Sequence, residues 1–338
     1  MSFREVEGQE RAGESFRRAI GSGRLAHAYI LVGPEGIGKR ALARAAAAYL
    51  FCSARKEDSC GVCRSCRLIA SDQFADLHWY ARPEDKTQLV VEVVEEFQRQ
   101  VYLKPVESVH KVFVLEDADR LNVSSANKLL KVLEEPPPAS LILLVALDVR
   151  DFLPTILSRC HVVRLRPLAT ETLAKGLVRS AGVTDSQARY LAAFTMGSPG
   201  LARTLATPEF FVERDWLIDA ATGLREGGQF AVAAELFKRS GDKDEAAQGR
   251  RETLLRFFDV LGLFYRDALS VALGSDPAGI ATTDRATDAK VLAERLGLEP
   301  LRGILAAIDR AREAVGFNAN QKLLLENLAF DIAKLQSP

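Results

Sequence analysis

The sequence lacks the features that would direct it to a membrane or to a highly charged partner. Its 338 residues carry 45 basic and 45 acidic side chains, so nucleic-acid binding cannot be argued from net charge and would need a local patch. No uninterrupted apolar run approaches membrane-spanning length, and residues 1–5 lack the charged and apolar regions of a signal peptide. We therefore expect a cytoplasmic protein with no membrane contact. A chain of this length that is 48% hydrophobic can form two or three domains.

Cysteine is rare, but four of the five cysteines are close together in the sequence. They are Cys52, Cys60, Cys63 and Cys66. In a chain without a secretion signal thiols stay reduced, so this spacing favours a metal ion over disulfides. We predict a structural zinc module at residues 52–66, because four sulfur ligands leave no position open for catalysis. An iron–sulfur cluster and four ordinary thiols are the alternatives, and we expect the remaining Cys160 to serve packing.

A phosphate-binding loop is present but lacks its metal ligand. Residues 33–39 have the spacing of a Walker A loop and follow the apolar run 28–32, which is typical of a buried strand. The phosphate-binding residues would be Gly33, Gly36, Gly38 and Lys39. The next residue is Arg40, where a working loop has the Ser or Thr whose hydroxyl binds Mg²⁺. A guanidinium cannot ligate a cation, so the sequence predicts a nucleotide-binding fold without its chemistry.

A second apolar strand, residues 111–115, is followed by a pair of acids in reversed order. Glu116 stands where a Walker B strand has Asp, and Asp117 stands where it has Glu. A carboxylate shortened by one methylene lies roughly an ångström farther from the attacking water, and such a displacement can cost about a hundredfold in rate. We expect at most weak ATP or ADP binding without turnover, since the loop glycines and Lys39 remain. The alternative for Lys39 is that it pairs with Glu116 and Asp117. The alternative for Asp119 is that it belongs to an ordinary acidic turn at the end of a strand.

A helix is predicted over residues 123–135, with Asn122 as its N-cap. One face carries Ala126, Leu129, Leu130 and Leu133. Prolines 136–138 end the helix. Glu134 and Glu135 lie at its C-terminal end, where the helix dipole disfavours negative charge, so local stability does not explain them.

Strands and helices alternate over the first half of the chain. A third strand, 141–145, follows the helix, and the alternation over residues 1 to about 165 indicates an α/β fold with a mostly parallel, doubly wound sheet. From residue 208 onward the sequence indicates helices separated by polar or Gly-rich breaks. An apolar stripe on the last helix (Leu324, Leu328, Ile332 and Leu335) is typical of packing within a helical bundle.

Several short segments, in their order and spacing, resemble bacterial clamp-loader subunits of the AAA+ class. They are residues 8–9, 25–29, the loop 33–39, the four cysteines, 127–137 and 153–160. Two subunit types share these motifs, the gamma/tau ATPase and the delta-prime subunit of DNA polymerase III. The altered phosphate-binding loop favours the delta-prime type.

The resemblance implies that further catalytic positions have changed. Active relatives have a polar sensor where this chain has Ala146, and their lid motif, here residues 197–200, ends in an arginine where this chain has Gly200. Together with Arg40 and Asp117, these changes predict that hydrolysis has been lost. The alternatives are an active clamp-loader ATPase of the gamma/tau type, another AAA+ ATPase, and a stand-alone zinc-dependent DNA-binding protein.

The resemblance also implies a role for Arg159 in another subunit. In the family the Ser-Arg-Cys motif supplies an arginine finger in trans to the neighbouring ATPase subunit. The alternative is an arginine that pairs with a local carboxylate. The resemblance further implies an AAA+ module (1–165), a helical lid (166–207) and an all-α collar (208–338) that joins gamma/tau and delta subunits. The sliding clamp and primer–template DNA would be reached through that complex.

Overall fold

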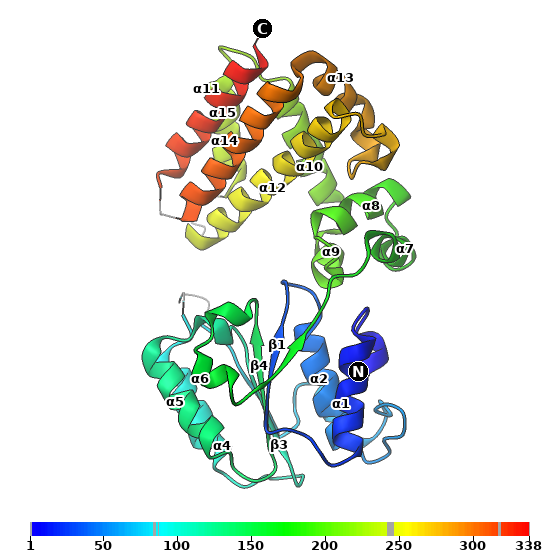
Figure 1. Cartoon of the computed structure of the whole chain (residues 1–338), viewed down its shortest axis with the longest axis vertical. Coiled ribbons are helices and arrows are strands. Elements are labelled where there is room, and N and C mark those ends of the chain that lie inside the picture. The colour runs from blue at the N-terminus through cyan, green and yellow to red at the C-terminus, as the bar shows by residue number, and fades with distance from the viewer. Residues whose placement is uncertain (1, 84–85, 87, 242–246, 317–318, 338) are drawn as a thin grey trace. The chain divides into compact units, whose positions relative to one another are not determined.

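Figure 1 shows the computed structural model of the chain, which describes residues 2–83, 86, 88–241, 247–316 and 319–337. The chain forms two compact units. The first comprises Met1–Leu168 and Ser198–Leu201, and the second comprises Ala169–Gly197 and Ala202–Pro338. The short segment Ser198–Leu201 thus belongs to the first unit, although the residues on both sides of it belong to the second.

The first unit is built on a five-stranded parallel sheet with the strand order β2-β3-β4-β1-β5. The strands are β1 (Ala28–Val32), β2 (Leu77–Tyr80), β3 (Lys111–Leu115), β4 (Ser140–Ala146) and β5 (His161–Arg164). The sequence predicts β1 and β3 with these bounds, and β4 is longer than predicted by one residue at each end. Every residue of β1 and β3 is buried, which is typical of a sheet covered on both faces. The predicted doubly wound α/β sheet is confirmed.

Helices cover both faces of this sheet. They are α1 (Glu10–Gly21), α2 (Lys39–Phe51), α3 (Arg64–Ala70), α4 (Val91–Val101), α5 (Val123–Glu134) and α6 (Pro154–Leu157). Successive residues of a strand point to opposite faces. Tyr29 and Leu31 accordingly pack with α1 and α2, whereas Ile30 packs on the other face with α4 and α5 (Figure 1). Two apolar cores, one on each face, hold the unit together.

The helix predicted at residues 123–135 is α5, and it ends one residue earlier. Asn122 is its N-cap as predicted, since the side-chain Oδ1 accepts a hydrogen bond from the backbone N–H of Ser125 at 2.8 Å. The buried face differs from the prediction at three positions, because Ser125 and Val132 are also fully buried and Leu130 is only partly buried. Glu134 is therefore the last residue of a well-anchored helix.

The second unit consists of helices. They are α7 (Thr170–Ala181), α8 (Asp185–Phe194), α10 (Pro208–Thr222), α11 (Gln229–Arg239), α12 (Ala247–Ala272), α13 (Ala286–Leu296), α14 (Leu298–Gly316) and α15 (Gln321–Gln336), and α9 (Pro199–Leu205) begins in the first unit. Short 3₁₀ helices in this unit are η4 (Pro277–Gly279) and η5 (Thr283–Arg285), and those in the first unit are η1 (Phe3–Glu5), η2 (Ala118–Arg120) and η3 (Val149–Asp151). Within the described ranges, none of the helices has the length and apolar character needed to cross a bilayer. The division into a lid and a collar at residue 208 stays a prediction.

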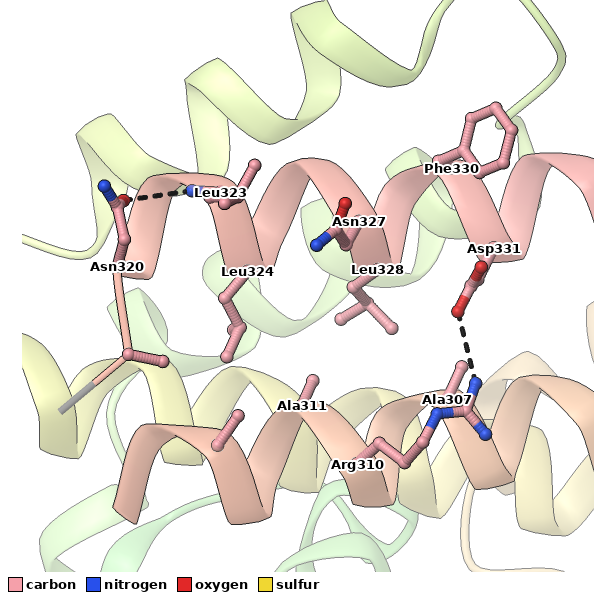
Figure 2. Close-up of a pocket in the computed structure, with 12 residues that line it drawn as sticks. Ala307, Arg310, Ala311, Asn320, Leu323, Leu324, Asn327, Leu328, Phe330 and Asp331 are labelled. Atoms are coloured by element: carbon pink, nitrogen blue, oxygen red, sulfur yellow. Dashed lines mark hydrogen bonds and ion pairs between the residues drawn. The ribbon is translucent and has the colours of Figure 1, made fainter. Parts of the chain in front are cut away.

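The last helix packs within its own bundle. Leu324, Leu328 and Ile332 are buried in the common core, and Leu335 packs against it. An open pocket of about 430 Å³ lies between α14 and α15 (Figure 2). At its edge Arg310 pairs with Asp331 at 3.2 Å. The apolar stripe found in the sequence is therefore core, as its periodicity predicts.

Candidate functional site

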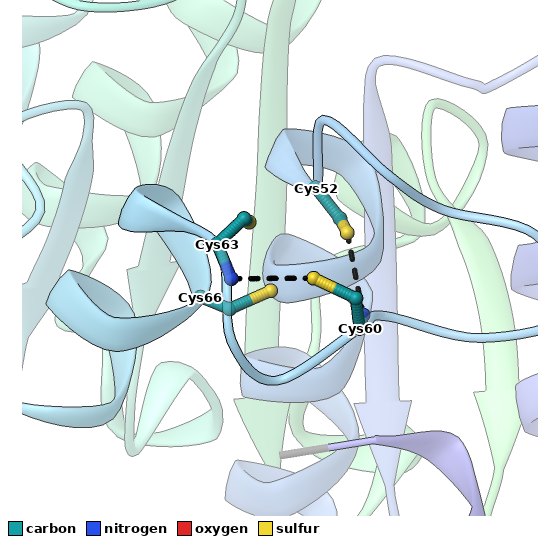
Figure 3. A group of neighbouring side chains, drawn as sticks. All are labelled: Cys52, Cys60, Cys63 and Cys66. Carbon is teal, nitrogen blue, oxygen red and sulfur yellow. Dashed lines mark hydrogen bonds between the residues drawn. The ribbon is translucent and has the colours of Figure 1, made fainter.

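The four clustered cysteines meet at the junction of two helices. Cys52 caps the C-terminus of α2, Cys63 is the N-cap of α3, and Cys66 follows one turn later in α3. The sulfur atoms of these three residues and of Cys60 all lie within 4.8 Å of one another (Figure 3). The structure thus brings together the whole predicted set, which could hold one metal ion. Cys160 packs against the apolar core on the other face of the sheet.

Backbone hydrogen bonds prepare these sulfurs for a cation. The N–H of Cys60 donates to Sγ of Cys52 at 3.3 Å, and the N–H of Cys63 donates to Sγ of Cys60 at 3.3 Å. Burial raises the pKa of Cys66 to about 12. Burial also acts to raise the pKa of Cys63, but the backbone N–H groups of Cys66 and Ser53 outweigh it and lower that pKa to about 6. N–H donors to sulfur and a compact set of four thiols are typical of structural metal sites.

The cysteine loop is fastened to the N-terminal residues. The carboxylate of Asp58 accepts hydrogen bonds from the backbone N–H groups of Phe3 (3.2 Å) and Arg4 (3.3 Å). The Arg4 guanidinium also pairs with Glu57 at 2.7 Å. Loss of order in this loop would therefore release the first residues of the chain.

The lysine of the phosphate-binding loop is turned toward the loop itself. Lys39 is buried, and its Nζ donates to the carbonyl oxygens of Gly33 (2.5 Å) and Pro34 (2.8 Å). Burial lowers the pKa of Lys39, whereas the charge of Asp119 opposes this shift. Gly36 and Gly38 adopt φ angles of 66° and 104°, which glycine tolerates best. The predicted loop is present, and the ammonium group of Lys39 forms hydrogen bonds with carbonyl oxygens of the same loop.

The two reversed acids pair with arginines. Among the ion pairs of the described residues, none joins Lys39 to either acid, since its Nζ donates to the two loop carbonyls. Instead, Nε of Arg40 lies 2.7 Å from Oε1 of Glu116, and Nε of Arg82 lies 3.3 Å from Oδ2 of Asp117. Burial raises the pKa of Glu116, and the adjacent Arg40 opposes the shift. The residue in the metal-ligand position thus pairs with the acid that would hold the metal through water.

Sequence reasoning missed Arg82, because it lies outside every recognised motif and its pairing depends on the tertiary fold.

Asp119 is structural, as its acidic-turn interpretation predicts. Its Oδ2 accepts a hydrogen bond from the backbone N–H of Leu147 at 2.7 Å, which fixes the chain after β4. The sensor position at the end of β4 holds the buried, apolar Ala146.

The lid motif contacts the phosphate-binding loop directly. The Ser198 hydroxyl donates to the carbonyl oxygen of Glu35 at 2.5 Å, and the Gly200 N–H donates to the carbonyl oxygen of Gly36 at 2.8 Å. A Cβ atom at Gly200 would lie only 2.6 Å from that Gly36 oxygen. A Cβ atom at Gly36 would in turn lie 2.5 Å from the backbone nitrogen of Leu201. The backbones meet so closely that no side chain, and hence no sensor arginine, fits at position 200.

Arg159 lies just beyond the short helix α6. Its Nη2 is 2.9 Å from Oε1 of Glu134, and its Nη1 donates to the Thr155 carbonyl (3.0 Å) and to the Ser158 hydroxyl (3.1 Å). The isolated chain therefore shows the local pairing that was the alternative to a role in trans. Glu134 was not predicted as its partner, although its unfavourable place at a helix C-terminus was visible in the sequence.

Comparison with known proteins distinguishes between the two subunit types. Residues 8–169 match the family described as "DNA polymerase III, delta subunit". The chain is 31% identical to DNA polymerase III subunit delta' of Pseudomonas aeruginosa, covering 94% of this chain and 95% of that protein. It is 28% identical to subunit delta' of Bacillus subtilis, covering 97% of both. Subunit gamma/tau of Mycobacterium tuberculosis is 32% identical, but the match covers 56% of this chain and 33% of that protein.

Substitution of Gly200 tests the contact between the lid motif and the phosphate-binding loop. Gly200→Ala should lower the stability of the first unit by about 1–3 kcal/mol, because the added Cβ overlaps the Gly36 oxygen. Urea unfolding followed by Trp79 fluorescence, in a Trp216→Phe background, reports on this unit alone, since the chain has two tryptophans. Gly21→Ala is the matched control: Gly21 also lies in the first unit and its Cβ meets nothing within 4 Å, so stability should stay constant or rise. Equal midpoints for both variants would contradict the close contact.

Proposed function

Because this chain belongs to the family of DNA polymerase III delta-prime subunits, we propose that it helps to load the sliding clamp onto primed DNA without hydrolysing ATP itself. Its direct partners would be the gamma/tau ATPase subunits and the delta subunit. The clamp and the primer–template DNA would be reached through that complex. This work needs no membrane, and the cytoplasmic location expected from the sequence stays a prediction.

The pairing of Arg40 with Glu116 carries the non-hydrolysing part of the proposal. Hydrolysis needs a cation that bridges phosphate oxygens, held by a hydroxyl and by Walker B acids. Here a guanidinium stands in place of the hydroxyl and pairs with the first acid at 2.7 Å, while Arg82 pairs with the second. ATP or ADP binding through Gly33, Gly36, Gly38 and Lys39 would be weak. An active ATPase of the gamma/tau type is not favoured, because the matches to gamma/tau and tau subunits cover only 33% and 46% of those proteins, whereas the two delta' subunits are matched over 95% and 97% of their length.

Arg159 is the residue that we propose acts on another subunit, as an arginine finger for the neighbouring ATP site. Arg159 would have no catalytic role at the nucleotide site of its own chain, because that site lacks the catalytic residues. The side chain is 35% exposed and its partner Glu134 is 51% exposed, so the pair is reachable from outside the chain. Exposed pairs of this kind contribute only about 0–1 kcal/mol, and a triphosphate can displace the carboxylate.

The four-cysteine cluster would hold one Zn²⁺ ion as a local cross-link. Four thiolates complete a tetrahedral shell, so the ion would stabilise the loop between α2 and α3 and leave no site for catalysis. Its influence should stay local, because the two apolar cores of the first unit are formed by other residues.

We predict one tightly held zinc ion per chain. Elemental analysis of protein purified under reducing conditions should return zinc, and Cys63→Ser should lose it because one of four ligands is removed. Hydrogen exchange should then increase at residues 3–4 and 57–58, which the loop holds together. Cys160→Ser is the control and should retain the ion. Absence of zinc from the wild-type chain, or iron in its place, would contradict the assignment.

The isolated chain should show no ATP turnover above background. Lys39→Ala should leave the clamp-loading rate of the reconstituted complex nearly unchanged, because a lysine that catalyses nothing has no rate to lose. Lys39→Met keeps the apolar stem and controls for loosening of the loop, whose carbonyls the lysine contacts. Robust turnover that Lys39→Ala abolishes would establish a divergent but working ATPase and overturn the proposal.

Arg159→Ala should fold and assemble, yet lower the clamp- and DNA-stimulated ATPase rate of the complex. An arginine finger contributes about three to five orders of magnitude at its own site, so total turnover falls only by the share of that site. Arg159→Lys should also fail, because a point charge does not replace the planar fork. Arg150→Ala is a matched control, since Arg150 is a nearby exposed arginine that pairs with Asp148. A wild-type rate for Arg159→Ala would disprove the role in trans, and loss of assembly would make Arg159 an interface residue.

A further inference from the structure

The guanidinium of Arg159 is engaged inside its own chain. Nη2 pairs with Oε1 of Glu134 at 2.9 Å, and Nη1 donates to the Thr155 carbonyl and the Ser158 hydroxyl. The two residues come from neighbouring elements, because α6 lies beside the C-terminal part of α5 (Figure 1). Arginine binds phosphate through paired N–H groups of its fork. Arg159 can therefore present the full fork to a phosphate only after it leaves Glu134.

Glu134 occupies a position that its own helix does not favour. It is the last residue of α5, where the backbone carbonyls already carry partial negative charge. The Arg159 cation offsets that repulsion. The next residue, Glu135, is equally acidic and exposed, yet no ion pair of the described residues includes it. Position 134 thus differs from position 135 in holding the arginine.

The pair is also weak enough to act as a reversible restraint. Both side chains are partly exposed, at 35% and 51%, and exposed ion pairs are screened by water and contribute little. The γ-phosphate and β-phosphate of a bound nucleotide offer more negative charge than one carboxylate. Arg159 consequently has two competing partners, one in its own chain and one in a neighbour.

We propose that Glu134 is a positioning residue that holds Arg159 away from the neighbouring ATP site until the clamp and DNA are bound. This inference rests on the proposed function of Arg159 as an arginine finger. Hydrolysis at the neighbouring site would scale with the fraction of complexes in which Arg159 has left Glu134. Binding of the clamp and DNA would bring the neighbouring site close enough to displace the carboxylate.

Glu134→Gln tests the proposal, because it keeps the shape of the side chain and removes its charge. In the reconstituted complex without clamp and DNA, ATP hydrolysis at the site that Arg159 faces should rise by roughly two- to fivefold, the range expected when one exposed ion pair is lost. The total basal rate should rise by the share of that site. The rate with clamp and DNA should stay at the wild-type value, so the ratio of stimulated to basal rate falls. Glu135→Gln is the matched control and should keep the wild-type ratio. A residue with a purely structural role would instead lower both rates.

The double variant Glu134→Gln/Arg159→Ala separates this inference from the proposed function. If Glu134 acts through Arg159, the double variant should have the same basal rate as Arg159→Ala alone. A wild-type ratio for Glu134→Gln, together with reduced stimulation for Arg159→Ala, would overturn the inference and leave the arginine finger intact. An Arg159→Ala complex with wild-type rates would overturn both. Failure of Glu134→Gln to assemble would make Glu134 an interface residue and also overturn the inference.

Discussion

The close approach of two backbones determines what the phosphate-binding loop can do. The Gly200 N–H donates to the Gly36 carbonyl at 2.8 Å, and neither position has space for a Cβ atom. This contact ties the segment Ser198–Leu201 to the first unit, although its flanking residues belong to the second. The loop is therefore stabilised by groups of the chain itself. An arginine at position 200 would require the two backbones to separate, so the missing sensor is a consequence of packing.

The acids beside the loop are also paired with groups of the chain itself. A carboxylate in a mostly buried place needs a cation nearby, and Glu116 is only 15% exposed. In an active site that cation is Mg²⁺. Here the guanidinium of Arg40, which stands in the position of the metal ligand, supplies the positive charge next to Glu116. The guanidinium of Arg82 supplies it next to Asp117. Arginines of the chain itself thus pair with both acids, and position 40 offers no hydroxyl as a metal ligand.

The parts of this structure that were predictable are those that depend on local sequence. The strands β1 and β3, the N-cap Asn122 and the meeting of four cysteines follow from apolar runs, capping chemistry and ligand spacing. The pairs Arg40–Glu116, Arg82–Asp117 and Arg159–Glu134 could not be predicted, because each joins residues that are far apart in sequence and meet only in the folded chain. The glycines at positions 36 and 200 signalled backbone constraints, but the sequence did not show that the two would meet each other.

The persistence of the loop motif has a structural explanation that is independent of nucleotide. The strand β1 lies between β4 and β5 in the sheet. The helix α2 follows it and buries Leu42, Ala43 and most of its alanines against the face that also holds Tyr29 and Leu31. The connection between β1 and α2 must therefore turn sharply, and Gly36 and Gly38 provide the left-handed φ angles of that turn. Lys39 closes the turn by donating to two loop carbonyls. A chain without hydrolysis would still need Gly36 and Gly38 to make this turn. The residues that surround the loop are therefore better evidence of activity than the loop motif.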